Sequence, residues 1–338
     1  MRRWRVLVPA AVLCLLAACG SPVTVAAPGA TSSAPSPSAS TPSERPAVTP
    51  IPAASIAAGL PAEALAARYG VDAQQFAAAR AFIGSLPWQY VTAGGVTQAV
   101  GCIGSGGPTV VYVNGLIIAA NWSWPLVAEA QATTNRVCLI DRAGTGVAPA
   151  RARGPNSPVL NATELVSAVR AAGEPGPYLA VGWSYGGLVA RTAAAVAPAD
   201  IVGLVLVDSV TPAAWRTYDP NGWTEGGTPL DMGTAEAAIT AQPSLSPRPV
   251  VVLQAGQWFN GQPAPASPEQ AALASASDNS VFALVPGVGH TIPQQAPATI
   301  VAATTAATES ITDGRPMPAC PAALETAGAV CQERPAAQ

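Results

Sequence analysis

Short apolar segments alternate with segments of helical composition between residues 109 and 311, and this order limits the fold more than any other feature. The expected strands are rich in Val, Ile and Leu, and they occupy residues 109–114, 136–141, 178–183, 201–208, 248–256 and 280–287. Continuous apolar strands separated by helices are typical of a parallel sheet that is covered on both faces. The sequence therefore predicts an α/β fold with a mostly parallel central sheet.

Helical segments fill the intervals and also precede the first strand. We expect helices at residues 61–70, 71–86, 125–134, 161–173, 185–197, 268–276 and 296–311. Asp72 with Gln75, and Asn161 with Glu164, have the spacing of helix-capping residues. Two strands flank Ala93-Gly94-Gly95 and predict a hairpin.

Two stretches depart from the alternation. Residues 209–247 are irregular and predict a short cap inserted over one end of the sheet. Residues 315–338 follow the last helix and predict a disulfide-closed tail. The folded domain is therefore expected to span residues 56–314.

The N-terminus has the pattern of an export signal. Arginines at positions 2, 3 and 5 precede the apolar run Val6–Leu16, which ends in Leu-Ala-Ala-Cys at Cys19. A basic start followed by a short apolar run is typical of a signal peptide, here residues 1–18. Leu-Ala-Ala-Cys resembles a bacterial lipobox, which implies lipidation of Cys19 and anchoring at the outer face of the cell membrane. An ordinary signal peptide, with a secreted product, is the alternative.

Residues 19–55 consist mainly of Ser, Pro, Ala, Thr and Val. Such a composition offers little apolar surface to bury and many breaks in regular structure, so we expect a disordered tether. The whole chain carries a net charge of −3 and no basic block. Nucleic acid is therefore not an expected partner.

Four cysteines remain outside the signal and the lipobox: Cys102, Cys138, Cys320 and Cys331. An even number in an exported protein predicts disulfides, and three pairings are possible. We favour Cys102–Cys138, between segments of two neighbouring strands, and Cys320–Cys331, which closes a local loop. A metal site is a poor alternative because no Cys-x-x-Cys spacing is present.

Gly182-Trp183-Ser184-Tyr185-Gly186 lies where an expected strand meets an expected helix. Two glycines around a serine at this junction predict a sharp turn that lifts the Ser184 hydroxyl clear of the sheet. The alternative is a serine that only caps the helix.

A serine nucleophile needs a base within hydrogen-bonding reach. The chain contains one histidine, His290, between the last expected strand and the last long helix. The carboxyl ends of parallel strands lie at one edge, so His290 is expected at the same edge as Ser184. A merely surface-exposed or capping histidine is the alternative.

Together, "GWSYGG", "GVGH", "VYVNG", "DRAGTG" and "LVLVD" resemble the α/β-hydrolase family over about residues 85–312. The family order of serine, acid and histidine implies an acid between Ser184 and His290. In most relatives the acid follows the strand after the cap. Here no carboxylate lies between that strand, residues 248–256, and Glu269. Some lipase-like relatives place it at the position of Asp208, which we favour. Asp278 is the second candidate, and an Asp208 that bonds only to loop backbone remains open.

The same resemblance implies an oxyanion site made of two backbone N–H groups. One comes from Tyr185, directly after the nucleophile, and the other from Leu116 in the loop after the first central strand. Relatives usually have His-Gly where this chain has Asn114-Gly115. Asp141-Arg142 resembles a family turn with a structural role. No metal or organic cofactor is implied.

The sequence thus predicts a serine hydrolase that cleaves carboxylic esters through an acyl-enzyme. An aminopeptidase, an envelope acyltransferase and a non-catalytic surface binding module are the alternatives. Epoxide hydrolases and dehalogenases are disfavoured because those relatives carry an aspartate at the elbow. The expected partners are a small-molecule or lipid ester and the membrane, and the sequence does not decide the oligomeric state. The tryptophans that could either fill the core or line an acyl pocket are Trp122, Trp124, Trp183, Trp215, Trp223 and Trp258.

Overall fold

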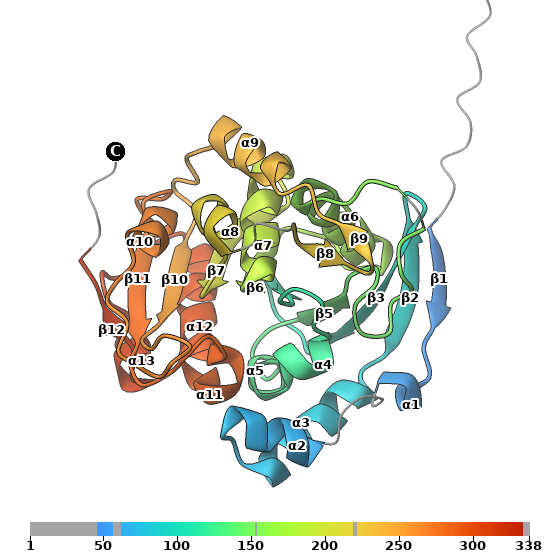
Figure 1. Ribbon diagram of the computed structural model, residues 1–338, viewed down its shortest axis with the longest axis horizontal. Coiled ribbons are helices and arrows are strands. Elements are labelled where there is room, and N and C mark those ends of the chain that lie inside the picture. Colours follow the sequence, from blue (N-terminus) through green and yellow to red (C-terminus); the bar gives the residue numbers. More distant parts are fainter. Residues whose placement is uncertain (1–45, 57–61, 153, 219–221, 334–338) are drawn as a thin grey trace, which may run out of the picture. The chain divides into compact units, whose positions relative to one another are not determined.

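A ten-stranded sheet organises the folded part of the chain in the computed structural model, which describes residues 46–56, 62–152, 154–218 and 222–333 (Figure 1). Its strands are β1 Ala47–Pro50, β2 Trp88–Ala93, β3 Val96–Ile103, β4 Thr109–Val113, β5 Val137–Asp141, β6 Tyr178–Trp183, β7 Ile201–Val207, β10 Val250–Ala255, β11 Ser280–Val285 and β12 Val330–Cys331. Their spatial order is β1-β2-β3-β5-β4-β6-β7-β10-β11-β12. The run from β5 to β11 is parallel, and the outer strands pair antiparallel.

Helices cover both faces of this sheet. They are α1 Ala53–Ile56, α2 Ala62–Tyr69, α3 Ala73–Ser85, α4 Ala120–Ser123, α5 Pro125–Gln131, α6 Pro158–Ala171, α7 Tyr185–Val196, α8 Pro212–Tyr218, α9 Gly233–Ala241, α10 Pro268–Ala274, α11 Ile292–Gln295, α12 Pro297–Asp313 and α13 Ala322–Thr326. One core lies between the sheet and α3, α5 and α12, and the other lies between the sheet and α6, α7 and α10. The predicted fold class is confirmed.

Strand β4 shows how the sequence produces two cores. Val110 and Tyr112 point into the first core, while Val111 and Val113 point into the second. Successive side chains of a strand point to opposite faces, so a strand covered on both sides must be apolar throughout. This is the reason that the central strands are continuous apolar runs rather than alternating ones.

The folded domain begins earlier than the sequence predicted. β1 pairs antiparallel with β2, so residues 47–50 belong to the sheet and not to the tether predicted for 19–55. A four-residue edge strand that ends in proline is hidden in a Ser/Pro/Ala-rich segment, because an edge strand needs pairing on one side only. The predicted signal peptide, Cys19 and most of the tether lie outside the described residues.

The insertion between β7 and β10 contains α8, α9 and a small hairpin, β8 Thr224–Glu225 with β9 Thr228–Pro229. It occupies the range predicted for the cap, residues 209–247. Among the described residues, no helix combines the length and the hydropathy that crossing a bilayer requires.

Helix starts were predicted with mixed success. Asp72 caps α3, where its carboxylate accepts a hydrogen bond from Gln75 N at 2.7 Å, as expected. The expected cap at Asn161 is wrong. Ser157 caps α6 through its hydroxyl, and Pro158 takes the first helical position, where its fixed φ favours the helix.

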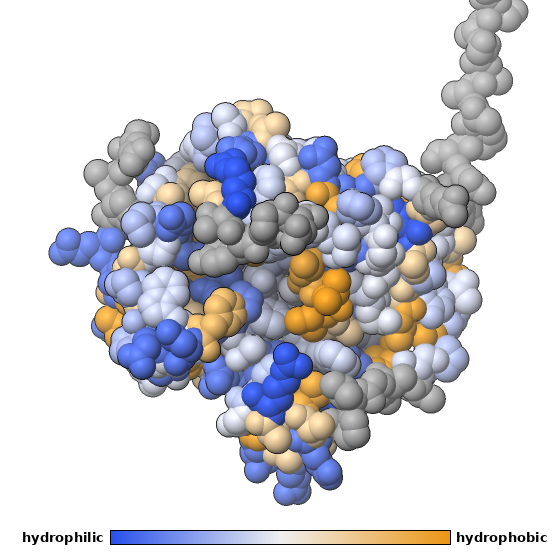
Figure 2. All heavy atoms as spheres, in the orientation of Figure 1, coloured by the Kyte–Doolittle hydropathy of each residue, from blue (hydrophilic) through white to orange (hydrophobic). Residues whose placement is uncertain are grey.

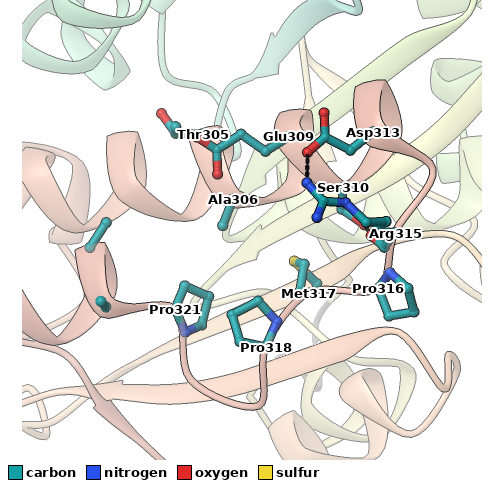
Figure 3. A pocket seen from close by; sticks show the side chains of 12 residues that line it. Thr305, Ala306, Glu309, Ser310, Asp313, Arg315, Pro316, Met317, Pro318 and Pro321 are labelled. Atoms are coloured by element: carbon teal, nitrogen blue, oxygen red, sulfur yellow. Dashed lines mark hydrogen bonds and ion pairs between the residues drawn. The ribbon is translucent and has the colours of Figure 1, made fainter.

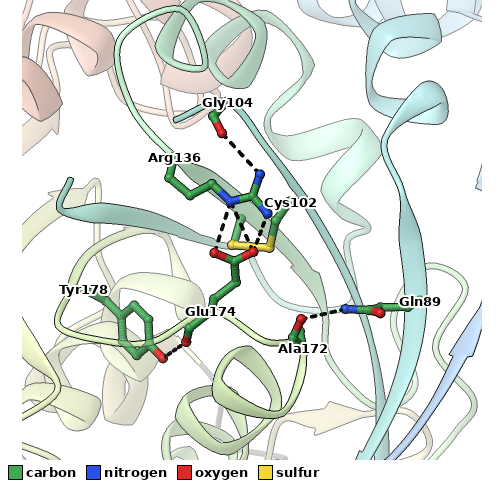
Figure 4. The surroundings of a disulfide bond; sticks show 8 residues. Gln89, Cys102, Gly104, Arg136, Ala172, Glu174 and Tyr178 are labelled. Atoms are coloured by element: carbon green, nitrogen blue, oxygen red, sulfur yellow. Dashed lines mark hydrogen bonds and ion pairs between the residues drawn. A yellow bond between two sulfur atoms is a disulfide. The ribbon is translucent and has the colours of Figure 1, made fainter. Parts of the chain in front are cut away.

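Both favoured disulfides are present. Cys102 and Cys138 are direct partners on the neighbouring strands β3 and β5, and Cys320 bonds to Cys331. Glu174 lies beside the first disulfide but pairs with Arg136, whose Nη1 also donates to Gly104 O at 3.2 Å (Figure 4). Two bonded sulfurs and a paired carboxylate leave no ligand for a metal at this place.

The C-terminal tail is more than an appendage. β12 pairs with β11 and covers the edge of the sheet, and the Cys320–Cys331 disulfide closes the loop that precedes it. A cavity of about 460 Å³ lies between α12 and this tail (Figure 3). Its charged side chains include Asp313 and Arg315, which pair with each other.

Candidate active site

Ser184 occupies the turn between β6 and α7 in a backbone conformation that few residues adopt. Its φ is 56° and its ψ is −124°. Such a conformation costs of the order of 1–3 kcal/mol and persists only where the surroundings enforce it. The turn is fixed on both sides, because Ser184 N donates to Val207 O and Ser184 O accepts from Val210 N, each at 3.0 Å.

The flanking glycines are required by close packing rather than by their own dihedral angles. A Cβ on Gly182 would lie 2.3 Å from the carbonyl oxygen of Gly186. A Cβ on Gly186 would lie 2.2 Å from the carbonyl oxygen of Val113 in β4. Helix α7 thus starts against the backbone of the two central strands, which only glycine permits. The predicted sharp turn is present.

His290 and Asp208 meet at the same edge of the sheet. His290 Nδ1 lies 2.6 Å from Asp208 Oδ2. The other carboxylate oxygen of Asp208 accepts a hydrogen bond from Ala255 N at 3.0 Å, which fixes the orientation of the side chain. Asp208 has a φ of 40°, so the chain turns sharply as it leaves β7. The acid is therefore held by backbone while its free oxygen faces the imidazole.

The two other carboxylates that the sequence left open lie elsewhere. Asp278 is exposed and precedes β11, which places it at the opposite edge of the parallel strands from Ser184. Glu269 lines the same cavity as Ser184, but its carboxylate accepts from Ser267 Oγ at 2.6 Å. This hydrogen bond holds the pKa of Glu269 below its usual value. Neither side chain orients His290.

Trp183, which precedes the serine, ties the histidine loop to the elbow. Its indole Nε1 donates to the carbonyl oxygen of His290 at 2.7 Å, and the two rings lie 5.4 Å apart. The same indole ring is 3.3 Å from the position that a Cβ on Gly115 would occupy. One buried side chain therefore contacts both loops that border Ser184. From the sequence, Trp183 is expected only in the core or in the pocket lining, and its bond to the histidine loop is not predicted.

The loop after β4 reaches the serine, as the family pattern implies. The Cβ position on Gly115 lies 3.7 Å from Ser184 Cβ. Among the described residues, no backbone oxygen accepts from the N–H of Leu116. Tyr185 is the first residue of α7, and the first N–H groups of a helix have no intrahelical acceptor. The N–H groups of Leu116 and Tyr185 thus have no backbone acceptor among the described residues.

A buried ion pair holds this loop in place. Arg142 Nη1 donates to Asn114 O at 2.8 Å, and Nη2 donates to Gly115 O at 2.9 Å. The same guanidinium binds Glu225 of the β8–β9 hairpin, and both side chains are almost fully buried. Burial by itself lowers the pKa of Arg142, but Glu225, Tyr185 and Asp141 together outweigh it, so the pKa lies above the ordinary value. Arg142 is therefore charged.

Glu225 links the cap to the loop beside Ser184, a role that no sequence pattern predicts. Its carboxylate accepts from Ile117 N at 3.4 Å and from Asn161 Nδ2 at 3.3 Å. Asn161 in turn donates to the hydroxyl of Tyr185 at 2.8 Å. No local pattern announces this contact, because it joins positions that are far apart in the chain. Removing one partner of such a buried pair typically costs about 3–5 kcal/mol.

The neighbouring Asp141 supports the same region from below. Burial raises the pKa of its carboxyl to about 6, although hydrogen bonds from Ala120 N, Val147 N and Asn114 Nδ2 favour the charged form. Its carboxylate also leaves no room for a side chain at Gly146. The structural role expected for the Asp141-Arg142 turn therefore extends to the loop beside Ser184.

A cavity of about 600 Å³ opens onto Ser184, Asp208 and His290. Most of its remaining lining is apolar and comes from α8, the cap and the loop after β10: Val210, Ala213, Ala214, Trp223, Trp258, Phe259 and Ala264. Of the tryptophans named above, Trp223 and Trp258 line it. Trp124 is buried against Tyr112, and Trp122 packs against α2 and α3.

Comparison with known proteins agrees with this architecture. Residues 105–266 match the model of the alpha/beta hydrolase family. The chain has the α/β-hydrolase fold. No curated protein matches the sequence.

Solved structures with the same fold have diverse activities. A bacterial membrane phospholipase A shares 15% identity over 75% of this chain and 93% of its own, with a TM-score of 0.53. An esterase from Thermogutta terrifontis shares 20% identity over 70% and 96%, with a TM-score of 0.50. The epoxide hydrolase CorEH shares 16% identity over 68% and 100%, with a TM-score of 0.52. At such identities the likeness establishes the hydrolase fold and not the substrate.

The glycine contacts predict an asymmetric response to added methyl groups. Gly186→Ala should lower the free energy of unfolding by about 2 kcal/mol, because the new Cβ collides with β4 backbone. Gly84→Ala in α3 is the matched control. Nothing lies within 4 Å of its Cβ position, so this variant should gain about 0.5–1 kcal/mol. Urea unfolding curves measure both values, and equal stability of Gly186→Ala and wild type would contradict the packing argument.

The indole hydrogen bond predicts a positioning role for Trp183. Trp183→Phe keeps the ring but removes the donor to His290 O, so kcat on a soluble ester should fall by roughly tenfold with KM little changed. Trp88→Phe, which removes an indole hydrogen bond of 2.8 Å to Ile83 O away from the cavity, is the control and should change kcat less than twofold. A displaced imidazole should also alter the pH–rate profile of Trp183→Phe. An unchanged kcat and profile would show that the bond is only structural.

Proposed function

We propose that the chain is a serine hydrolase that cleaves carboxylic esters through an acyl-enzyme. The observation that carries this proposal is the 2.6 Å contact between His290 Nδ1 and Asp208 Oδ2 in a cavity that Ser184 also lines. A nucleophile, a base and an orienting acid at one edge of a parallel sheet form the constellation that acyl transfer needs.

In the first step, Ser184 Oγ attacks the carbonyl carbon of the ester while His290 Nε2 accepts the hydroxyl proton. Asp208 holds Nδ1–H of the ring and stabilises the imidazolium that forms. The negative charge on the former carbonyl oxygen is stabilised by the N–H groups of Tyr185 and Leu116. His290 then donates its proton to the leaving alkoxide, and the ester C–O bond breaks.

The second step regenerates the serine. Water enters the cavity, loses a proton to His290 and attacks the acyl carbon. His290 then returns the proton to Ser184 Oγ as the acyl C–O bond breaks, which releases the carboxylic acid and free Ser184. These steps use only side chains and backbone groups of this chain. The largely apolar lining supports an ester with an apolar acyl group as the substrate. A serine at the elbow also favours an ester over an epoxide, since the relatives that open epoxides carry aspartate there.

The sequence pattern around Cys19 supports a further part of the proposal, that the enzyme is exported and held by a lipid anchor at the outer face of the bacterial membrane. Such a location would bring an esterase close to lipid substrates.

A fluorophosphonate probe tests the proposed nucleophile. The wild-type chain should be labelled, and it should hydrolyse p-nitrophenyl esters in preference to aminoacyl anilides. Ser184→Ala should lose labelling and turnover while keeping the wild-type unfolding curve. A folded wild-type chain that takes no label and has no turnover would leave a binding module as the better reading. A preference for anilides would point to an aminopeptidase.

Replacement of the acid tests the triad. Asp208→Asn should lower kcat/KM by about 10³-fold or more, because the amide cannot stabilise the imidazolium. Asp278→Asn is the matched control, since Asp278 is exposed at the far edge, and its rate should stay within twofold of wild type. The triad is wrong if Asp208→Asn retains near-wild-type turnover.

A further inference from the structure

Among the described residues, the largest exposed apolar side chains lie in the loops after β4 and β10. Ile117 is 66% exposed, Trp258 48% and Phe259 87%. The other large apolar residues exposed in the described part of the chain are valines. Burying a side chain such as Phe typically gains about 1.5–3 kcal/mol, so two aromatic rings and an isoleucine left together in water point to an interaction surface.

We call these three side chains the rim: Trp258 and Phe259 line the cavity, and Ile117 lies in the loop after β4. Ile117 lies in the loop whose Gly115 borders Ser184. The ring of Phe259 lies 5.6 Å from that of His290, and Trp258 lines the cavity beside it. Figure 2 looks onto this face and shows strongly hydrophobic side chains gathered next to a hollow.

The backbone presents the aromatic pair on a rigid turn. Trp258 N donates to Gln262 O, and Gly261 N donates back to Trp258 O, both at 2.8 Å. Asn260 Oδ1 accepts from Gln262 N at 3.1 Å and closes the turn further. A turn with its own hydrogen bonds keeps both rings outside the core rather than letting them collapse inward.

Ile117 is exposed at a backbone cost. Its φ is 55°, in the left-handed region that β-branched residues avoid. Glycine or asparagine would fit this position without strain, and the side chain of Ile117 gains little burial in return. A strained, exposed apolar residue in the loop beside Ser184 suggests that its side chain contacts a binding partner.

We propose that the rim docks the catalytic mouth onto the surface of a lipid aggregate or bilayer. This proposal rests on the proposed ester hydrolysis. A protein that covered the rim would also close the cavity, whereas a lipid surface brings the ester to it. The sequence supports the same occupant, because a chain anchored through Cys19 would work beside a bilayer. The shared chemistry is insertion of apolar side chains below the headgroups.

The charges near the rim indicate how docking should depend on salt. The whole chain has a net charge of −3, and the cavity lining includes no arginine. Attraction to anionic headgroups therefore contributes little, and binding should not weaken with ionic strength as a polybasic surface would. Zwitterionic vesicles are the appropriate probe.

The test measures binding without catalysis and without an acyl anchor. It uses the chain from Gly20 to Gln338, which keeps every described helix and strand and lacks Cys19, with Ser184→Ala to prevent turnover. This protein should co-sediment with phosphatidylcholine vesicles, and its partition should change less than twofold between 0.05 and 0.5 M NaCl (about 14 to 4 Å in screening length). Trp258→Ser/Phe259→Ser should reduce the partition roughly tenfold or more.

Two single variants separate the rim from general effects. Ile117→Asn should weaken vesicle binding but raise the thermal midpoint, since asparagine tolerates the left-handed conformation. Val196→Ser is the control and should bind like the parent, because Val196 is 38% exposed at the far end of α7, about 18 Å from Ser184.

The parent protein failing to bind vesicles, or the rim variants binding as well as the parent, would overturn the proposal. Binding that disappears at high salt would also overturn it. These outcomes are independent of the fluorophosphonate result, so failure of lipid docking and failure of ester hydrolysis can be told apart.

Discussion

The contact between the start of α7 and the backbone of the central strands is the constraint on which the site depends. Gly182 and Gly186 let helix and strands approach within distances that exclude a side chain, and this approach forces Ser184 into its strained conformation. Ser184 is therefore positioned by main-chain packing. Its hydroxyl lies at the carboxyl end of the strands because Ser184 occupies the tight turn between β6 and α7.

The loops that complete the site are each held by a different interaction. Trp183 fixes the histidine loop through one indole hydrogen bond, and the backbone N–H of Ala255 fixes Asp208. Arg142 fixes the loop that carries Leu116 through two carbonyl oxygens. Because Arg142 pairs with the Glu225 carboxylate, the cap supports the loop after β4 and is not only a wall of the cavity.

The combination of a rigid interior and an exposed apolar rim fits an enzyme whose substrate comes from an apolar phase. Hydrogen bonds and close packing fix Ser184, His290 and Asp208, so little reorganisation is needed when a substrate binds. The rim side chains, by contrast, make few contacts with their own molecule. Their apolar surface can therefore still be buried against another surface, with a gain in free energy.

By itself, the sequence determined the parallel sheet, the glycine-flanked serine turn and the histidine after the last parallel strand. It favoured the observed pairing of the four cysteines among three possible ones. These features follow from local composition and from the order of strands and helices, which periodicity reveals directly. Only the tertiary structure decided that Asp208 rather than Asp278 faces the imidazole and that residues 47–50 form a strand of the sheet. It also decided that Glu225, through Arg142, supports the loop after β4. Each of these depends on contacts between segments that are far apart in the sequence. The energy of such contacts comes from burial and the exclusion of water, which local sequence patterns do not predict.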